Sequence, residues 1–253
     1  MPSSALSVFI IAYNSASKIE ACLKSVCWAG EIIVVDSFSA DQTVPLCRKY
    51  GARVYSREFQ NYADQKNYAL SLVQNPWALS VDSDEVVTEA LKEEILRTLA
   101  SNPAAAAYRI PRKSFIFGRP FRFTGTQEDA PVRLLLASRA RFEQPVHEVV
   151  RVVGETGTLA NPMLHFTYDG ISDYLNRLNR YTTLEADYLK SKNVPISFID
   201  FFFRPCAVFL RLFILKQGFR DGFEGFLFSV FSAFYTLVKY AKYREILKTA
   251  HAA

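Results

Sequence analysis

The sequence predicts an α/β fold built on a mostly parallel sheet, followed by a helical segment rich in phenylalanine. Residues 6–13 (LSVFIIAY) form a continuous apolar run of strand length, which is typical of a strand buried on both faces of a parallel sheet. Further strand-like runs alternate with segments of helical periodicity, which is the order of right-handed β–α–β units. With 253 residues, half of them hydrophobic, the chain can bury one sizeable core and carry an appendage.

The individual elements follow from local patterns. Strands are expected at 6–13, 31–35, 51–55 and 77–81. Helices are expected from about residue 17, where Ser17 and Glu20 fit a capping box, and at 39–48, 61–73 and 88–99. Short alternating stretches with glycine and proline at 108–167 indicate antiparallel strands and loops. Residues 173–192 predict an amphipathic helix, and Pro195 marks a boundary.

Acidic and amide side chains stand where several predicted strands end. Asp82 and Asp84 follow the strand at 77–81, Asp36 ends the strand at 31–35, and Asn14 follows the first strand. Ligands of such sheets bind beyond the carboxyl ends of the strands. Carboxylates spaced i and i+2 can turn toward one cation, and hard oxygen ligands suit Mg²⁺ or Mn²⁺. Alone, this pair also fits an acidic turn that caps the next helix. The polar ends of the other strands favour a nucleotide site.

These segments resemble family 2 glycosyltransferases with the GT-A fold. The resemblance rests on residues 8–14 (VFIIAYN), 33–43 (IVVDSFSADQT), 65–67 (QKN) and 79–85 (LSVDSDE). Four later segments are similar to the lipopolysaccharide-core β-glucosyltransferase group: 133–135 (RLL), 146–148 (VHE), 164–165 (LH) and 180–181 (RY). The similarity covers most of residues 5–190.

The resemblance implies roles for particular residues. Asp84 would be the main metal contact, and Asp82 would touch ribose or metal. His165 would reach the metal or the diphosphate, with a buried, hydrogen-bonded histidine as the alternative. Asp36 would bond the uracil or the ribose, although a capping aspartate is the alternative. Ala12, Tyr13 and Asn14 would border the nucleotide. Lys66 and Arg133 would meet the diphosphate, with surface or ion-paired roles as the alternative.

The implied reaction is transfer of a hexose from a nucleotide sugar, with UDP-glucose as the donor that the resemblance indicates. The acceptor would be a saccharide or a lipid-linked glycan such as the lipopolysaccharide inner core. Polyprenyl phosphate, capsule and protein acceptors remain alternatives. One general base acting on the acceptor hydroxyl inverts the anomeric configuration. Glu148, after a predicted strand, is the favoured base and Asp129 is its rival.

We expect three parts along the chain. Residues 1–195 would form the GT-A catalytic domain, with a nucleotide-sugar half at about 1–105 and an acceptor half at about 106–195. Residues 196–253 would form a helical, basic tail. This tail region holds 12 of the 21 phenylalanines, all between 198 and 234, and residues 200–253 carry eight basic against four acidic residues, a net +4.

The tail predicts helices that lie at a membrane surface. Its longest charge-free stretch, residues 225–238, has 14 residues, whereas a membrane-spanning helix needs roughly 20. Aromatic faces with interspersed arginine and lysine suit the interface of anionic lipids. Packing on the catalytic domain or on a second subunit, as in a homodimer, is the alternative. The N-terminus has no secretory pattern, so we expect a cytoplasmic protein at the inner face of the cell membrane.

Other classes fit the sequence less well. A pI near 9.0 suggests nucleic-acid binding, but the positive charge lies in the phenylalanine-rich tail and no recognition motif occurs. A nucleotidyltransferase should carry a glycine-rich phosphate loop, which residues 6–17 lack. The four cysteines form no CxxC pair, so buried, reduced thiols are expected.

Overall fold

The computed structural model describes residues 3–144 and 149–252, and the chain divides into two compact units. The first unit comprises Met1–Arg112 and Asp129–His165, and the second comprises Lys113–Glu128 and Phe166–Ala253. The chain does leave its helical course near Pro195, as predicted. The compact units do not follow the boundary at 195/196, however, because residues 166–191 group with the tail. The predicted functional halves are not tested by this division.

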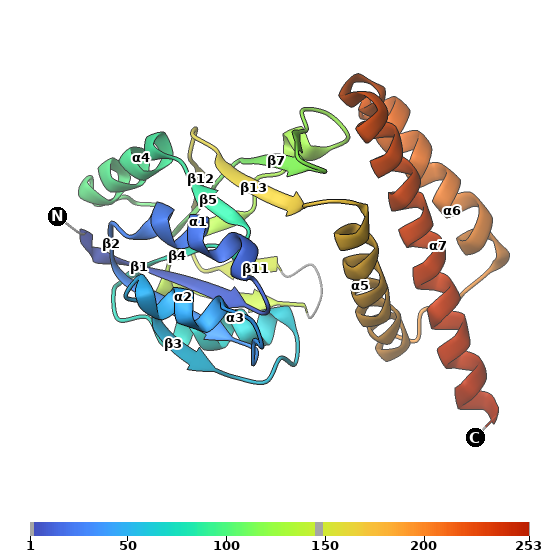
Figure 1. The fold of residues 1–253 in the computed structure, drawn as a ribbon, viewed down its shortest axis with the longest axis horizontal. Coiled ribbons are helices and arrows are strands. Elements are labelled where there is room, and N and C mark those ends of the chain that lie inside the picture. Colours follow the sequence, from blue (N-terminus) through green and yellow to red (C-terminus); the bar gives the residue numbers. More distant parts are fainter. Residues whose placement is uncertain (1–2, 145–148, 253) are drawn as a thin grey trace. The chain divides into compact units, whose positions relative to one another are not determined.

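The first unit is built on a mixed, mostly parallel sheet (Figure 1). Within the described residues its strand order is β12-β6-β9-β4-β1-β2-β3. β9 runs antiparallel to both of its neighbours, and the other adjacent pairs are parallel. The strands span Ser3–Ala12 (β1), Ala29–Asp36 (β2), Arg53–Ser56 (β3), Trp77–Ser80 (β4), Ala107–Arg109 (β6), Val132–Leu136 (β9) and Thr156–Thr158 (β12).

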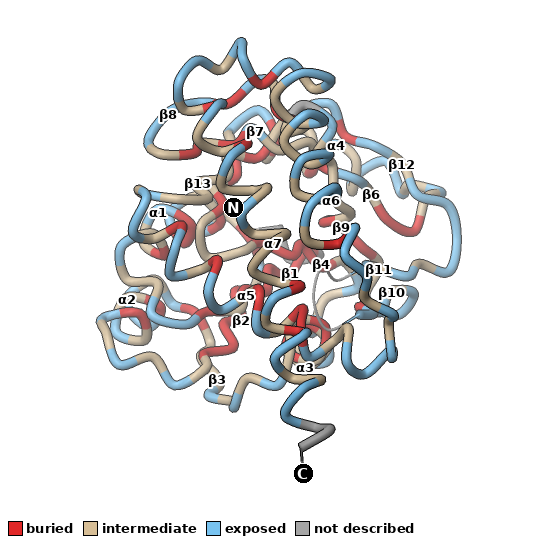
Figure 2. Tube along the Cα trace, turned by 90° about the vertical axis from the view of Figure 1, so that its right-hand side faces the viewer, coloured by how far each residue is buried: buried red, intermediate tan, exposed pale blue. Residues whose placement is uncertain are grey.

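Helices cover both faces of this sheet because successive side chains of a strand point to opposite sides. Leu6, Val8 and Ile10 of β1 belong to one core cluster, and Phe9 belongs to the other. The first cluster includes buried residues of α1 (Ala16–Val26), α2 (Thr43–Lys49) and α4 (Glu89–Ala100). The second includes residues of α3 (Tyr62–Ser71) and of β10 (Ala140–Glu143), which pairs with β11 (Val149–Val152). The central strands are accordingly buried along most of their length (Figure 2).

The helix starts show which local signals were reliable. Asn61 and Thr88 cap α3 and α4, each accepting a backbone N–H with its side chain, so these predicted starts are confirmed. The expected capping box at Ser17 is wrong, because α1 already begins at Ala16. The start expected for α2 at residue 39 is also wrong, since α2 begins only at Thr43. Of the cysteines, Cys22 and Cys47 are buried as expected, but Cys27 and Cys206 are exposed.

A short antiparallel pair completes the first unit. β5 (Glu85–Val87) pairs with the beginning of β13 (Met163–Tyr168), and Glu85 stands opposite His165 in the register. Two 3₁₀ turns, at Thr126–Glu128 and Ala137–Arg139, flank β9 in sequence. The β5–β13 pair was not predicted. It places a histidine from late in the chain beside the acidic segment 82–85.

The second unit consists mainly of three helices, α5 (Ile171–Ser191), α6 (Phe198–Leu210) and α7 (Gly222–Ala252) (Figure 1). The hairpin of β7 (Arg112–Ile116) and β8 (Arg119–Pro120) adds to it, and a π-helical turn (Arg211–Leu215) and a 3₁₀ turn (Gly218–Asp221) join α6 to α7.

Polar contacts join α5 to α7 along their length. The Glu185 carboxylate accepts hydrogen bonds from Tyr235 (2.8 Å) and Lys239 (2.9 Å), and Tyr174 stacks on Phe231 with 5.2 Å between ring centroids. The predicted amphipathic helix is thus part of the tail's own bundle. None of the described helices combines the length and the apolar composition that crossing a membrane requires.

Candidate active site

The carboxyl ends of three parallel strands meet at one edge of the sheet. Ala12 at the end of β1 stands opposite Asp36 at the end of β2, and Phe9 of β1 stands opposite Ser80 of β4. The segment that begins at Asp82 therefore leaves the sheet at the same edge as Tyr13 and Asn14. The strand-end residues that the sequence singled out come from neighbouring positions, as expected for parallel strands.

Asp36 and Asn14 together hold the loop that follows β2. The carboxylate of Asp36 is buried and accepts from the backbone N–H of Ser39 (2.9 Å) and from its hydroxyl (2.5 Å). Asn14, at a left-handed φ of 46°, donates its N–H to the Ser39 hydroxyl (2.8 Å) and accepts from the N–H of Ala40 (2.9 Å). Asp36 thus shapes a turn and does not cap α2. Tyr13 is about half exposed, at 48%.

Asp41 fixes the start of α1 from the same loop. Its carboxylate accepts from the N–H of Ala16 (3.0 Å) and from the N–H and hydroxyl of Thr43 (2.9 and 2.5 Å). Burial raises the pKa of Asp41, but these hydrogen bonds outweigh it and lower the pKa below its ordinary value. The competition of these short-range bonds explains why α2 begins later than its sequence pattern suggested.

Asp82 lies between two buried cations. Its carboxylate accepts from Lys66 Nζ (2.9 Å) and from a guanidinium nitrogen of Arg133 (2.5 Å). Lys66, on α3, and Arg133, on β9, are 2% and 4% exposed. Burial raises the pKa of Asp82, but the positive charges of Arg133 and Lys66 prevail and hold the pKa well below its usual range. The structure therefore brings together three of the predicted residues.

Glu85 is a site residue that the sequence reasoning did not single out. Its side chain is fully buried and accepts from Arg133 (2.5 Å), from Arg112 (3.2 Å) and from the backbone N–H of Asp82 (2.8 Å). Its own N–H donates to the carbonyl of Asp82 (2.9 Å), which closes the turn. The only sequence signal was its position directly after the aspartate pair.

Asp129 joins the same set of charges through Arg112. Its Oδ2 accepts from Arg112 Nε (2.7 Å) and lies 2.6 Å from a terminal guanidinium nitrogen, and Arg112 N–H donates to the Asp129 carbonyl (2.8 Å). The rival candidate, Glu148, and its neighbour His147 lie outside the described residues. We use the name charge network for the side chains linked in this way: Lys66, Asp82, Glu85, Arg112, Asp129 and Arg133.

Asp84 and His165 form a pair beside the charge network. Asp84 Oδ1 lies 3.7 Å from His165 Nε2, and both side chains are mostly buried. A cation with bond lengths of about 2.1 Å can contact two atoms at that separation. Within the described ranges no group of three or more His, Cys, Asp or Glu side chains could hold a metal. Mg²⁺ is commonly bound by one or two carboxylates, with substrate phosphates and water completing the shell, so Asp84 fits such a site as its carboxylate ligand.

The comparison with known families decides what kind of protein this is. The profile described as Glycosyl transferase family 2 matches residues 7–148, which is more than half of the chain. The chain belongs to this family. The predicted family, the GT-A fold class and the assignment as a glycosyltransferase are thereby confirmed.

Individual relatives agree with the family. The chain is 29% identical over 250 residues to the lipopolysaccharide core biosynthesis glycosyltransferase LpsC of Rhizobium meliloti (strain 1021), covering 96% of this chain and 93% of LpsC. It is 30% identical to an uncharacterized glycosyltransferase of Rickettsia bellii (strain RML369-C), covering 95% and 86%. The crystal structure of S. aureus TarS 1-349 in complex with UDP-GlcNAc aligns with a TM-score of 0.50 at 16% identity, covering 94% and 82%. That likeness concerns the fold alone.

Proposed function

We propose that this glycosyltransferase moves a hexose from a UDP-sugar, with glucose as the favoured hexose, to a saccharide or lipid-linked acceptor of the lipopolysaccharide core. The observation that carries the proposal is the Asp84–His165 pair, which lies beside the charge network where the segment after β4 leaves the sheet. The similarity to LpsC over nearly the whole chain supports the acceptor class. The choice of glucose rests on the resemblance described above.

The donor's nucleotide would lie along the ends of β1 and β2. Ala12, Tyr13 and Asn14 would border it, and Asp36 would meet the uracil or the ribose in addition to holding its turn. The exposed ring of Tyr13 and the fixed turn support this placement. The charge network would stand at the sugar-diphosphate end, where Lys66 and Arg133 supply positive charge.

Asp84 and His165 would hold a Mg²⁺ or Mn²⁺ ion. Such an ion would offset the negative charge that the leaving nucleoside diphosphate gathers. Asp82 remains a candidate for ribose or metal. In that role the ribose or the metal ion would compete with Lys66 and Arg133 for the carboxylate oxygens of Asp82. We therefore favour Asp82 as the residue that aligns these two cations.

One general base would take the proton of the acceptor hydroxyl, so the anomeric configuration would be inverted. We retain Glu148 as the favoured base. The rival Asp129 has one carboxylate oxygen engaged by Arg112, which supports the preference. Polyprenyl phosphate, capsule and protein acceptors remain the alternatives to the lipopolysaccharide core.

The helices at 196–253 would bring the enzyme to the inner face of the cell membrane. Large apolar side chains are exposed on α6, on α7 and between them, among them Phe203 (66%), Leu215 (75%) and Phe223 (67%). Basic residues are interspersed with them in sequence, which suits an anionic lipid surface. A homodimer that covers the same side chains is the alternative.

A ligand-binding and transfer experiment tests the site. Thermal shift with a panel of UDP-sugars and Mn²⁺ or Mg²⁺ should reveal the donor, because a ligand stabilises the state that it binds. Asp84→Ala should abolish both the metal-dependent shift and transfer to lipopolysaccharide core acceptors, with an unchanged circular dichroism spectrum. Asp187→Ala, at an exposed position of α5, is the matched control. Full transfer by Asp84→Ala in metal-free buffer would refute the proposed metal site.

A further inference from the structure

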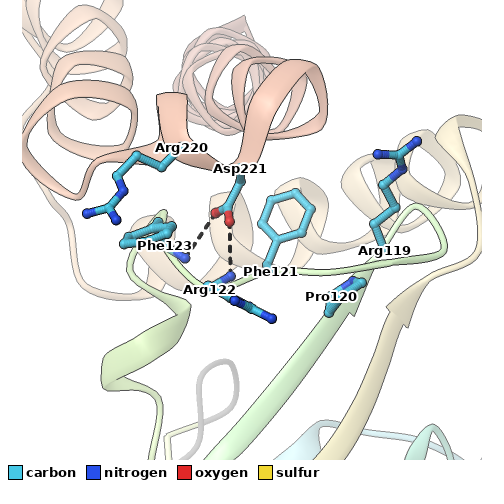
Figure 3. A pocket seen from close by; sticks show the side chains of 7 residues that line it. All are labelled: Arg119, Pro120, Phe121, Arg122, Phe123, Arg220 and Asp221. Carbon is cyan, nitrogen blue, oxygen red and sulfur yellow. Dashed lines mark hydrogen bonds between the residues drawn. The ribbon is translucent and has the colours of Figure 1, made fainter.

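An open pocket of about 420 Å³ lies in the second unit, between the segment after β8 and the turn before α7 (Figure 3). Three of its seven lining residues are arginines, and one is acidic. The lining residues are Arg119, Pro120, Phe121, Arg122, Phe123, Arg220 and Asp221. We call this feature the arginine pocket. It lies outside the sheet edge that carries the candidate active site.

The acid of the arginine pocket is used to build its wall. Asp221 accepts from the backbone N–H groups of Arg122 and Phe123 (3.0 Å each) and from the hydroxyl of Thr124 (2.6 Å). Figure 3 shows the carboxylate directed at these backbone nitrogens. Three arginines against this one aspartate leave the lining residues with a formal net charge of +2.

The arginines are held by the protein with their charge toward solvent. The guanidinium of Arg220 lies 4.2 Å from the ring centroid of Phe123 and donates to Gln217 (2.8 Å). Arg119 lies 3.2 Å from Glu224 but is 70% exposed, and Arg122 is exposed. Guanidinium groups are suited to phosphate because their N–H groups match its oxygens in pairs. The arginine pocket therefore fits a phosphate-bearing ligand.

The backbone around the arginine pocket is closely packed. A Cβ atom placed on Gly225 would lie 2.1 Å from the carbonyl oxygen of Gly218, so the turn before α7 sits directly against that helix. Gln217 takes a left-handed φ of 57° at the start of this turn. The arginines are thus presented from a fixed scaffold.

Apolar side chains beside the arginine pocket indicate the source of the phosphate. Leu215, Phe219 and Phe223 are 75%, 52% and 67% exposed, and they fall within the same short segment as Arg220 and Asp221. A soluble phosphate would engage the arginines and leave these side chains in water. A lipid layer would take up both, since transfer of apolar surface out of water is favourable.

We propose that the arginine pocket binds the phosphate of an anionic membrane lipid while Leu215, Phe219 and Phe223 enter the adjoining hydrocarbon. The inference rests on the proposed membrane association and deepens it, because it assigns the lipid contact to one site. It is independent of the metal, the donor and the base.

Co-sedimentation of the full chain with vesicles tests this assignment. The vesicles contain phosphatidylcholine alone, or phosphatidylcholine and phosphatidylglycerol in equal amounts. Arg122→Gln with Arg220→Gln should weaken binding to the anionic vesicles about 30-fold, from the usual contribution of two basic residues near a lipid surface. The control, Lys190→Gln with Lys192→Gln, removes the same charge from exposed positions at the end of α5 and should change binding less than about threefold.

The apolar contribution needs a second variant. Leu215→Ser with Phe219→Ser changes side chains that are 75% and 52% exposed and should weaken vesicle binding about tenfold or more. Because the Phe219 ring lies 6.2 Å from that of Phe213, thermal unfolding is measured to confirm that the fold is kept. Equal losses in the two charge variants would overturn the site but leave general membrane attraction intact. Displacement from vesicles by inorganic phosphate, together with full binding by the apolar variant, would identify free phosphate as the ligand and overturn the lipid assignment. If the wild-type chain does not bind anionic vesicles, the proposed membrane association is wrong. Glycosyl transfer is measured separately, so this result does not bear on the proposed reaction.

Discussion

Replacing Glu85 by glutamine should destabilise the protein strongly, although Glu85 is not an expected ligand. The substitution keeps the size of the side chain and removes one negative charge from a fully buried position. Glu85 accepts from Arg133, Arg112 and the N–H of Asp82, and a glutamine amide would turn its NH₂ group toward one of these donors. Arg133 is 4% exposed and contacts two carboxylates of the charge network, those of Asp82 and Glu85. After the substitution, Asp82 is the one of these two that keeps its charge.

The magnitude follows from the burial of both partners. Removing one member of a buried ion pair costs about 3–5 kcal/mol when the remaining charge stays buried without compensation. Here Asp82 still pairs with Arg133 and Asp129 with Arg112, so the loss should lie near the lower figure, about 3 kcal/mol. For a chain of this size that loss lowers the unfolding temperature by about 6–12 °C. Glu89→Gln is the matched control, since Glu89 is 72% exposed and pairs with Lys92 one helical turn away. An exposed pair of this kind contributes almost nothing to stability.

Thermal unfolding followed by circular dichroism measures both variants in the same buffer. Transfer activity should also fall in Glu85→Gln at temperatures where it stays folded, because the turn that carries Asp84 is closed by Glu85. The reasoning is refuted if Glu85→Gln unfolds within 2–3 °C, or about 1 kcal/mol, of Glu89→Gln. In that case the attraction within the charge network would only offset the free-energy cost of removing its charges from water.

Three further outcomes are expected. Because neighbouring cations hold the folded-state pKa of Asp82 below its unfolded value despite burial, its ionised form stabilises the fold fully above about pH 5. The difference in unfolding free energy between wild type and Asp82→Asn should therefore be constant from pH 5 to 8 and shrink on further acidification. Gly225→Ala should cost about 1–3 kcal/mol in urea unfolding through the clash of its Cβ atom, whereas Gly170→Ala, in open space, should cost less. Glu148→Gln should lower kcat about 10²–10⁴-fold, and a comparable loss only in Asp129→Asn would reverse the assignment of the base.

The central sheet could be predicted because its signals are local. A strand buried on both faces tends to carry a near-continuous apolar run, as residues 8–12 of β1 and 32–35 of β2 do. Asn61 and Thr88 cap their helices from adjacent positions, so the starts of these two helices could also be predicted. The strand-end carboxylates followed from the rule that parallel strands finish at one edge.

Pairs distant in sequence could not be predicted in this way. Arg133 meets Asp82 across 51 positions, and Arg112 meets Glu85 across 27, through an antiparallel strand and a connection whose geometry no local pattern specifies. Charged side chains are rarely buried, so a residue pattern assigns them to the surface. The late start of α2 has a different, local cause, because the Asp41 carboxylate accepts from the N–H and the hydroxyl of Thr43.

The expected metal ligand depends partly on Glu85 and Arg112, which the sequence did not mark. Asp84 stands between Asp82, held by Lys66 and Arg133, and Glu85, held by Arg133 and Arg112. The turn is also closed by hydrogen bonds between Asp82 and Glu85 in both directions. The position of Asp84 opposite His165 is therefore set before any ligand arrives, which is the preorganisation that charge stabilisation in a transition state requires. It follows that substitutions of Arg112, which is not an expected contact of the donor, should impair transfer by misplacing Asp84.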